Sequence, residues 1–212
     1  MTAARRRRLA AVLATAGLAV MPGCGDAART GRSPVLLVIM SLEAASGATP
    51  TAFGGTLDSD VLTNVSRTVE GGRQDVPTVF SDVGRVSLRF TLKDPGVPGG
   101  AATPSALNQV TINRYQVVYR RSDGRNTPGV DVPHPFDSAV TVTLPTEGAA
   151  TAAFELVRHT AKGEAPLAAL RTNGVIISAM ADITFSGHDL AGNAVTVTGS
   201  IGVQFGNFGD SR

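Results

Sequence analysis

Two long runs near the end of the chain alternate apolar and polar side chains with a period of two. This period puts successive side chains on opposite faces of an extended strand, so each run predicts a strand with one buried face. Turn-forming residues from His188 to Asn193 separate the runs, which predicts an antiparallel hairpin. The predicted inward residues are Val175, Ile177, Ala179, Ala181, Ile183 and Phe185 in the first strand, and Val195, Val197, Ile201, Val203 and Phe205 in the second.

Shorter runs predict further strands earlier in the chain, at residues 35–41, 56–62, 85–93, 110–119, 140–144 and 153–158. The run 35–41 is apolar on both faces, which indicates a central strand or one with mixed burial. Within 110–119 the apolar positions change from even to odd numbers. We therefore expect a β-bulge near Asn113 and Arg114 that keeps both sets on one face. Helical pattern is confined to a short turn at 164–171.

The composition supports the same fold class, because the apolar residues are mainly Val, Ile, Leu and Ala and the 24 Gly and 12 Pro supply many turns. About eight strands separated by such turns predict an all-β fold, specifically an antiparallel β-sandwich. The sequence contains no internal repeat and no second boundary, so residues 35–212 are expected to form a single domain.

The turn Asp189-Leu190-Ala191-Gly192-Asn193 resembles the D-x-A-G-N turn between the last two strands of many bacterial immunoglobulin-like and fibronectin III-like domains. The resemblance covers about 30 residues, Val175 to Phe205. It implies an immunoglobulin-like sandwich and a role in adhesion, spacing or carbohydrate-side display more often than in catalysis.

The first residues have the layout of an export signal. Arg5 to Arg8 precede the apolar segment Leu9 to Val20, which is shorter than the about 20 residues that a bilayer span requires. Residues 1–23 are therefore predicted to be a cleaved signal peptide, exported by either the general or the twin-arginine route. Residues 24–34 are small and polar, which is typical of a flexible tether.

Met21-Pro22-Gly23-Cys24 resembles the lipobox of bacterial lipoprotein signal peptides, with Pro22 departing from the usual pattern. The resemblance implies that Cys24 receives diacylglycerol, becomes the new N-terminus and anchors the protein to a membrane, on the periplasmic face or the outer membrane in a cell with two membranes. Cys24 is the one cysteine of the chain, so no internal disulfide is expected. The alternative is an incidental cysteine in a simple signal peptide.

Charge argues against nucleic acid as a partner. Removing the four arginines of the N-terminal run from the 19 Lys and Arg leaves 15 against 17 Asp and Glu, a net charge of −2. Nucleic-acid binding needs clustered cations instead. The expected partners are the membrane, through the lipid, and an envelope protein or glycan.

Residues with catalytic or metal-binding chemistry are scattered, so we expect no catalytic residue, no cofactor and no metal site. His134, His159 and His188 lack metal-type spacing. Asp189 and Asn193 are explained by turn formation rather than by calcium binding. Asp58 and Asp60 share one face of a strand but have too few companion oxygen donors for calcium.

The segment Tyr119 to Ala139 is long for a sandwich loop and rich in polar side chains, which is where sandwich proteins often place recognition. The alternative is a solvated connection, stiffened by prolines and held by Arg–Asp pairs. The candidate recognition residues are Arg121, Asp123, Arg125, Asn126, Asp131 and His134.

These features together predict a non-catalytic lipoprotein of the cell envelope that acts as a binding or structural module. The second hypothesis is a periplasmic small-ligand or carbohydrate-binding domain, or an enzyme accessory subunit, that uses the loop 119–139. An enzyme with residues gathered from several loops is the third.

Overall fold

The computed structural model describes residues 32–208. Within them the chain forms twelve strands. The strands are β1 (Val35–Ala45), β2 (Thr56–Asp60), β3 (Thr63–Val69), β4 (Gly72–Thr78), β5 (Asp82–Leu92), β6 (Gly96–Val97), β7 (Gly100–Ala101), β8 (Val110–Arg120), β9 (Phe136–Leu144), β10 (Ala150–Val157), β11 (Ile177–Asp189) and β12 (Ala194–Gly206). The helical segments are the 3-10 turns η1 (Ala106–Asn108) and η2 (Leu167–Arg171) and the short helix α2 (His159–Lys162). The predicted all-β class is confirmed.

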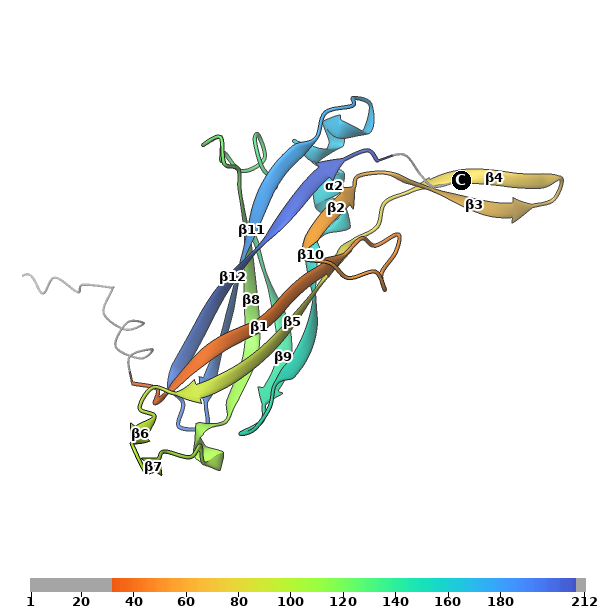
Figure 1. Ribbon diagram of the computed structural model, residues 1–212. Helices are drawn as coiled ribbons and strands as arrows, with labels where there is room; N and C mark the ends of the chain where they lie inside the picture. Colours follow the sequence, from red (N-terminus) through yellow and green to blue (C-terminus); the bar gives the residue numbers. More distant parts are fainter. Residues whose placement is uncertain (1–31, 209–212) are drawn as a thin grey trace, which may run out of the picture.

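Two sheets form the body of the molecule (Figure 1). One has three strands in the order β1-β5-β10, and the other has five in the order β2-β12-β11-β8-β9. Two small hairpins, β3-β4 and β6-β7, stand apart from both sheets. The predicted hairpin near the C-terminus is confirmed as β11-β12, which pair antiparallel from Ile177 opposite Phe205 to His188 opposite Ala194.

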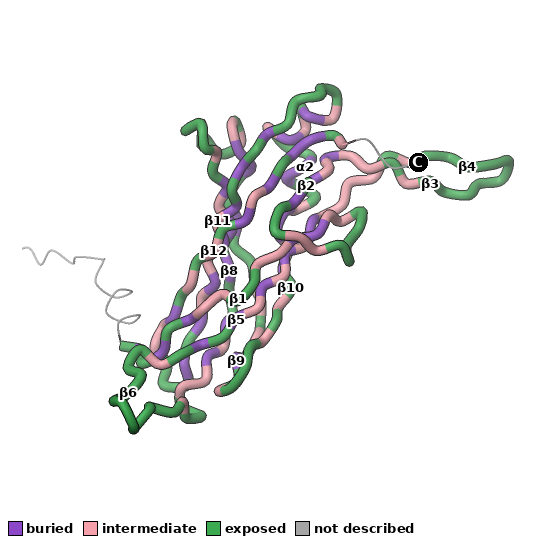
Figure 2. Tube along the Cα trace, viewed as in Figure 1, coloured by how far each residue is buried: buried purple, intermediate pink, exposed green. Residues whose placement is uncertain are grey.

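The apolar faces of both sheets contribute to one core, seen as the buried segments in Figure 2. The ring of Tyr115 on β8 lies 5.2 Å from that of Phe154 on β10, and Phe154 lies 5.3 Å from Phe185 on β11. Tyr119 donates a 2.6 Å hydrogen bond to the carbonyl oxygen of Leu156 on β10. Burial raises the pKa of Tyr119, so its hydroxyl stays protonated and remains a donor.

The predicted bulge in β8 is confirmed at Asn113, which both neighbouring strands skip in their register. Val110 and Ile112 before the bulge and Tyr115, Val117 and Tyr119 after it are all buried. One extra residue therefore keeps two sets of opposite parity on the same face, as a bulge does.

The structure corrects two details of the sequence predictions and decides between two alternatives for a third. β2 pairs parallel to β12, so the arrangement is not wholly antiparallel; strands this far apart in sequence are not joined by a tight turn that would force opposite directions. The segment 35–41 lies in β1, an edge strand in which Val35 and Leu37 are buried while Leu36 and Met40 are half exposed, so the predicted mixed burial is confirmed and the central position is not. Val175 precedes β11 and is exposed, so it is not an inward residue.

The β3-β4 hairpin was not predicted from the sequence. Its strands carry few apolar residues, and the tight turn at Glu70-Gly71 depends on the positive φ of Gly71 and Gly72. The hairpin extends away from the body, with every residue from Ser66 to Asp75 exposed (Figures 1 and 2).

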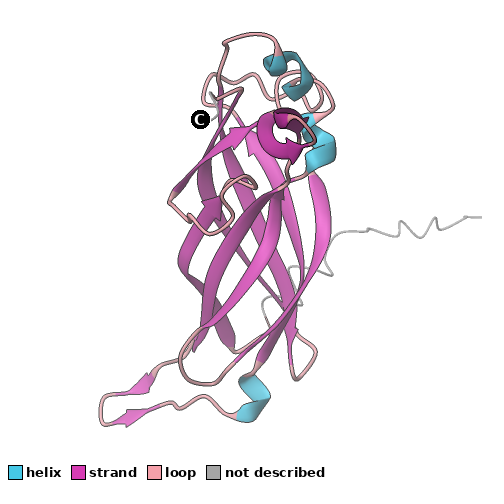
Figure 3. Cartoon of the chain, turned by 90° about the vertical axis from the view of Figure 1, so that its right-hand side faces the viewer, coloured by secondary structure: helices cyan, strands magenta, loops and turns pink. Residues whose placement is uncertain are grey.

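The body has two distinct ends, which Figure 3 shows from the side. At the N-terminal pole, Ser33 donates a 2.8 Å hydrogen bond to Asp189 in the β11-β12 turn, and η1 lies nearby. Asp189 also accepts from the backbone and side chain of Asn193, which confirms the predicted turn chemistry. At the hairpin pole lie β3-β4, α2, η2 and the last described residues.

A buried ion pair joins the elements of the hairpin pole. Lys162 on α2 lies 2.8 Å from Asp82 at the start of β5, and the two side chains are 1% and 0% exposed. Asp82 also accepts hydrogen bonds from the Ser59 hydroxyl and the Gly47 amide, while Lys162 donates to the carbonyl oxygen of Asp60. Burial raises the pKa of Asp82, and Lys162 acts against that rise.

We predict that Lys162→Met lowers the free energy of unfolding by about 3–5 kcal/mol, because it leaves the Asp82 carboxylate buried without its partner. The double variant Lys162→Met/Asp82→Asn should lose much less than the sum of the two single variants, since no uncompensated charge then remains. Urea unfolding of the four proteins gives the coupling energy.

The matched control is Arg114→Met, which removes the exposed ion pair between Arg114 and Asp137 and should change stability by less than about 1 kcal/mol. Additive losses in the double variant would contradict the coupled, buried pair.

Candidate functional site

The loop predicted for recognition, now residues 121–135 between β8 and β9, is held by its own charged side chains. Asp123 forms ion pairs with Arg121 at 2.5 Å and with Arg125 at 3.0 Å. The hydrogen bonds from Arg121 and Arg125 hold the pKa of Asp123 below its usual range. Asn126 accepts a 2.6 Å hydrogen bond from the Arg121 amide, so four of the six candidates form one local cluster.

The other two candidates stabilise the second half of the loop. Asp131 accepts a 3.2 Å hydrogen bond from the amide of Thr127, and the Asp131 amide donates to the Thr127 carbonyl oxygen. His134 packs on Gly129, where a β-carbon would lie 2.4 Å from its Nε2 atom. The geometry thus matches the solvated, internally paired connection, and none of the six candidates lines the cavities described next.

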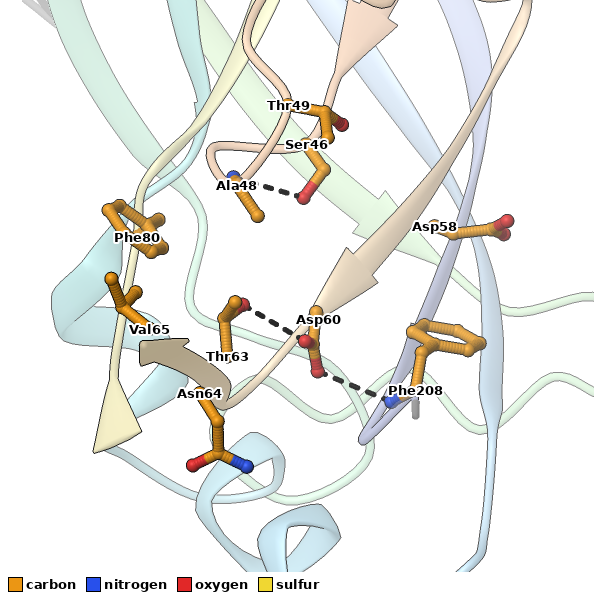
Figure 4. Close-up of a pocket in the computed structure, with 10 residues that line it drawn as sticks. All are labelled: Ser46, Ala48, Thr49, Asp58, Asp60, Thr63, Asn64, Val65, Phe80 and Phe208. Carbon is orange, nitrogen blue, oxygen red and sulfur yellow. Dashed lines mark hydrogen bonds between the residues drawn. The ribbon is translucent and has the colours of Figure 1, made fainter. Parts of the chain in front are cut away.

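A cleft of about 510 Å³ lies at the base of the β3-β4 hairpin (Figure 4). Its walls come from the loop after β1, from β2, from the start of β3, and from Phe80 and Phe208. Most of the lining side chains offer a hydroxyl, a carboxylate, an amide or an aromatic ring; these are Ser46, Thr49, Asp58, Asp60, Thr63, Asn64, Phe80 and Phe208. We call this site the β2 cleft.

The alternation of β2 places its two carboxylates on the cleft side. Leu57 and Ser59 are buried beneath the strand, so Asp58 and Asp60 project from the opposite face, as their spacing predicted. Asp60 accepts hydrogen bonds from the Thr63 hydroxyl at 2.9 Å and from the amides of Leu62 and Phe208. Its carboxylate is therefore occupied in holding the cleft walls together.

Asp58 differs from Asp60 because it is exposed and its carboxylate makes no hydrogen bond or ion pair within residues 32–208. It also lines a second cavity of about 280 Å³, which shares Ser46, Thr49 and Asp58 with the β2 cleft. A free carboxylate between two adjoining hollows is available to accept hydrogen bonds from a ligand.

The chemistry of the β2 cleft suits a polar, uncharged or cationic molecule. Carboxylate and hydroxyl oxygens accept and donate hydrogen bonds, while the rings of Phe80 and Phe208 provide apolar contact area. Between residues 32 and 208, no three His, Cys, Asp or Glu side chains are grouped as metal ligands. His188 and His159 are exposed at different ends of the body, and His159 lies at the start of α2 beside Ser81.

Sequence reasoning found the two aspartates but not the cleft. Phe80 and Phe208 belong to no predicted strand, and they are 128 positions apart in a chain whose fold alone brings them together. The nearest signal is the pair Asp58 and Asp60, whose spacing of two on a strand places both carboxylates on one face.

The predicted lipidation site, Cys24, lies outside the described residues, as do the predicted signal peptide and most of the predicted tether. Within residues 32–208, no helix has the length and apolar character needed to cross a membrane.

Comparisons with known proteins give no match: no family model fits the chain, and no curated protein or solved structure is detectably similar to it.

We predict that substituting the two aspartates of the β2 cleft changes the free energy of unfolding by very different amounts. Asp60→Ala should lower the free energy of unfolding by about 1–3 kcal/mol, because three hydrogen bonds to a carboxylate are lost. Asp58→Ala should stay within about 0.5 kcal/mol of the parent protein, since Asp58 has no partner in the described chain. Thermal or urea unfolding measures both, and a large loss in Asp58→Ala would show that Asp58 has a structural role.

Proposed function

We propose that this chain is a non-catalytic lipoprotein of a bacterial cell envelope, exported and anchored through Cys24, whose folded part acts as a binding module. The charged and apolar segments before Cys24, the lipobox-like Met21 to Cys24 and the absence of a second cysteine support the anchor. Stable anchoring needs a second acyl chain, which the lipoprotein pathway adds at the new N-terminus.

We further propose that the folded part is an immunoglobulin-like β-sandwich. The strand order supports this assignment: β1-β5-β10 corresponds to strands A, B and E, and β12-β11-β8 corresponds to G, F and C, with β9 added at the outer edge as in variable-type domains. The Trp and the inter-sheet disulfide of antibody domains are missing, since the chain has no Trp and one Cys. Tyr115 of one sheet and Phe154 of the other pack against each other instead, with ring centroids 5.2 Å apart.

The observation that carries the functional proposal is the opposite placement of the two ends. The chain enters the body at the N-terminal pole through Ser33, while the β2 cleft and the hairpin lie at the other pole (Figure 1). A tether of the length of residues 24–34 reaches at most about 40 Å. An anchor at Cys24 would therefore join the body at the pole opposite the β2 cleft, so the attachment itself would not cover the cleft.

The second candidate function, carbohydrate or small-ligand binding, is favoured at the β2 cleft rather than at the loop 119–139. The cleft volume of about 510 Å³ lies in the range of ligand sites, and its free carboxylate, hydroxyls and aromatic rings are the groups that recognise sugar hydroxyls and C–H faces. In the loop, the same kinds of side chain already satisfy one another. We propose a glycan of the envelope as the ligand.

The anchor predicts that Cys24→Ala releases the protein from membranes into the soluble fraction, because the acyl chains have no other attachment point. Fractionation and metabolic labelling with a radioactive fatty acid measure the result. Thr30→Ala, in the same tether, should leave both labelling and membrane retention unchanged. Continued membrane retention of the Cys24→Ala protein would contradict the anchor.

The β2 cleft predicts that Asp58→Asn weakens glycan binding about tenfold or more, since a hydrogen bond to a charged group is replaced by one to a neutral amide. The measurement is a glycan array, followed by calorimetry with the best oligosaccharide. Asp123→Asn, which alters the loop 121–135 alone, is the matched control and should bind as the parent protein does. Unchanged binding by Asp58→Asn together with weakened binding by Asp123→Asn would contradict the cleft and assign recognition to the loop 121–135.

A further inference from the structure

The β3-β4 hairpin is a two-stranded sheet with little support from the body. All ten residues from Ser66 to Asp75 are exposed, and within residues 32–208 no third strand pairs with either of its edges. An isolated two-stranded hairpin is marginally stable in water, and three or more strands with an apolar face are needed for independent stability. An extended hairpin of this kind is therefore suited to pairing with another strand.

The position of Pro77 identifies which groups of β4 face outward. In an antiparallel pair, alternate residues turn their N–H and C=O groups away from the partner strand. Pro77 has no N–H and lies opposite Asn64, so this pair is one that makes no hydrogen bonds across the hairpin. By alternation, the backbone groups of Asp75 and Arg73 also face outward from β4.

The outward residues of β4 are complementary to themselves. Arg73 and Asp75 flank Gln74, so two copies of β4 placed antiparallel with Gln74 opposite Gln74 bring each Arg73 opposite the Asp75 of the other copy. The two neighbouring registers that also match the backbone groups put Arg73 opposite Arg73 or Asp75 opposite Asp75. Like charges directly opposite each other are destabilising, so charge selects the first register.

The side chains of the hairpin fit the same register. Val69 lies beside Gly72, and Val65 lies beside Val76, on one face of the hairpin. With Gln74 opposite Gln74, Gly72 of one copy lies opposite Val76 of the other. Each of two rows across the four strands then contains three valines and one glycine. Exposed Val69, 44% accessible in the single chain, gains apolar neighbours in this arrangement.

The opposite face of the hairpin is polar, and its side chains also fit the register with Gln74 opposite Gln74. Thr68 lies beside Arg73, and Ser66 donates a hydrogen bond to Asp75 at 2.5 Å. In the paired sheet, the Arg73–Asp75 contact between copies is flanked by Thr68 on one side and Ser66 on the other.

From this pattern we infer that the β3-β4 hairpin is a self-association arm: two copies of the chain pair through the outer edges of β4 and form a four-stranded antiparallel sheet with the order β3-β4-β4-β3. The arrangement is two-fold symmetric, as closed dimers are. It goes beyond the proposed anchoring and glycan binding and depends on neither.

The first test is disulfide trapping in the full mature chain carrying Cys24→Ala. Gln74→Cys should form a covalent dimer under mild oxidation, because residues opposite each other in a pair without hydrogen bonds have Cα atoms about 4.5 Å apart, within disulfide range. Arg67→Cys lies on the same face but on β3, so its two copies are separated by three strand spacings, about 14 Å, and should not cross-link. Equal cross-linking of the two variants would overturn the register.

The second test reverses the charges and reads the dimer dissociation constant by analytical ultracentrifugation. Arg73→Asp and Asp75→Arg should each weaken the dimer about tenfold or more, since both contacts become like-charge pairs. An equimolar mixture of the two variants, and separately the double variant Arg73→Asp/Asp75→Arg, should restore association. Circular dichroism checks that each variant remains folded, as expected for exposed positions.

Two results would overturn the inference. A parent chain that remains monomeric at concentrations near 1 mM has no self-association of useful strength, and the edge would then be free for a strand of another protein. A parent dimer that is unaffected by either single charge reversal has its interface elsewhere.

Discussion

The ion pair between Lys162 and Asp82 connects four elements at the hairpin pole, two of which line the β2 cleft. In the described chain no disulfide links the elements, so this pair and its hydrogen bonds connect α2, the start of β5, β2 and the loop after β1. Charges removed from water are costly unless they are fully paired, and here each oxygen of Asp82 has a partner. Any other arrangement of these four segments would leave a buried charge without a partner, so it is disfavoured.

The same network shapes the β2 cleft. Asp82 accepts from Gly47, one residue after the cleft residue Ser46, and Lys162 binds the backbone carbonyl of Asp60, whose side chain lines the cleft. The hydrogen bonds of this ion pair thus hold two walls of the cleft, the loop after β1 and the strand β2. The Asp58 carboxylate has no partner in the described residues, which makes it the more available of the two cleft carboxylates for a ligand.

Features that depend on residues close together in the sequence could be predicted, whereas those that depend on distant residues could not. The strands β5, β11 and β12 and the bulge at Asn113 were predictable because side-chain alternation is a local pattern. The β3-β4 hairpin was not, because the valines on one of its faces are interrupted by Arg67 and Gln74 and its strands carry almost no burial signal. The pairing of Asp82 with Lys162, 80 positions apart, and the meeting of Phe80 with Phe208 depend on the completed fold.

The long polar loop shows the limit of reading function from composition. Its six candidate residues resemble a recognition surface in the sequence, yet in the fold their charges and amides pair within the loop. A side chain that has already satisfied its hydrogen bonds must break them to bind a ligand, whereas one that has none must only lose water. By that criterion the less conspicuous Asp58 is the better candidate.

The β2 cleft and the hairpin arm share residues, so pairing and binding have a geometric connection. Thr63, Asn64 and Val65 line the cleft and also begin β3. Two chains joined through β4 would therefore hold two β2 clefts at the bases of their arms, in a fixed relation to each other. Envelope glycans are repetitive polymers, and two linked weak sites bind such a ligand 10²- to 10⁴-fold more tightly than one when both can engage. Under the proposed glycan binding, such avidity would let a shallow site with one free carboxylate retain the protein at a surface.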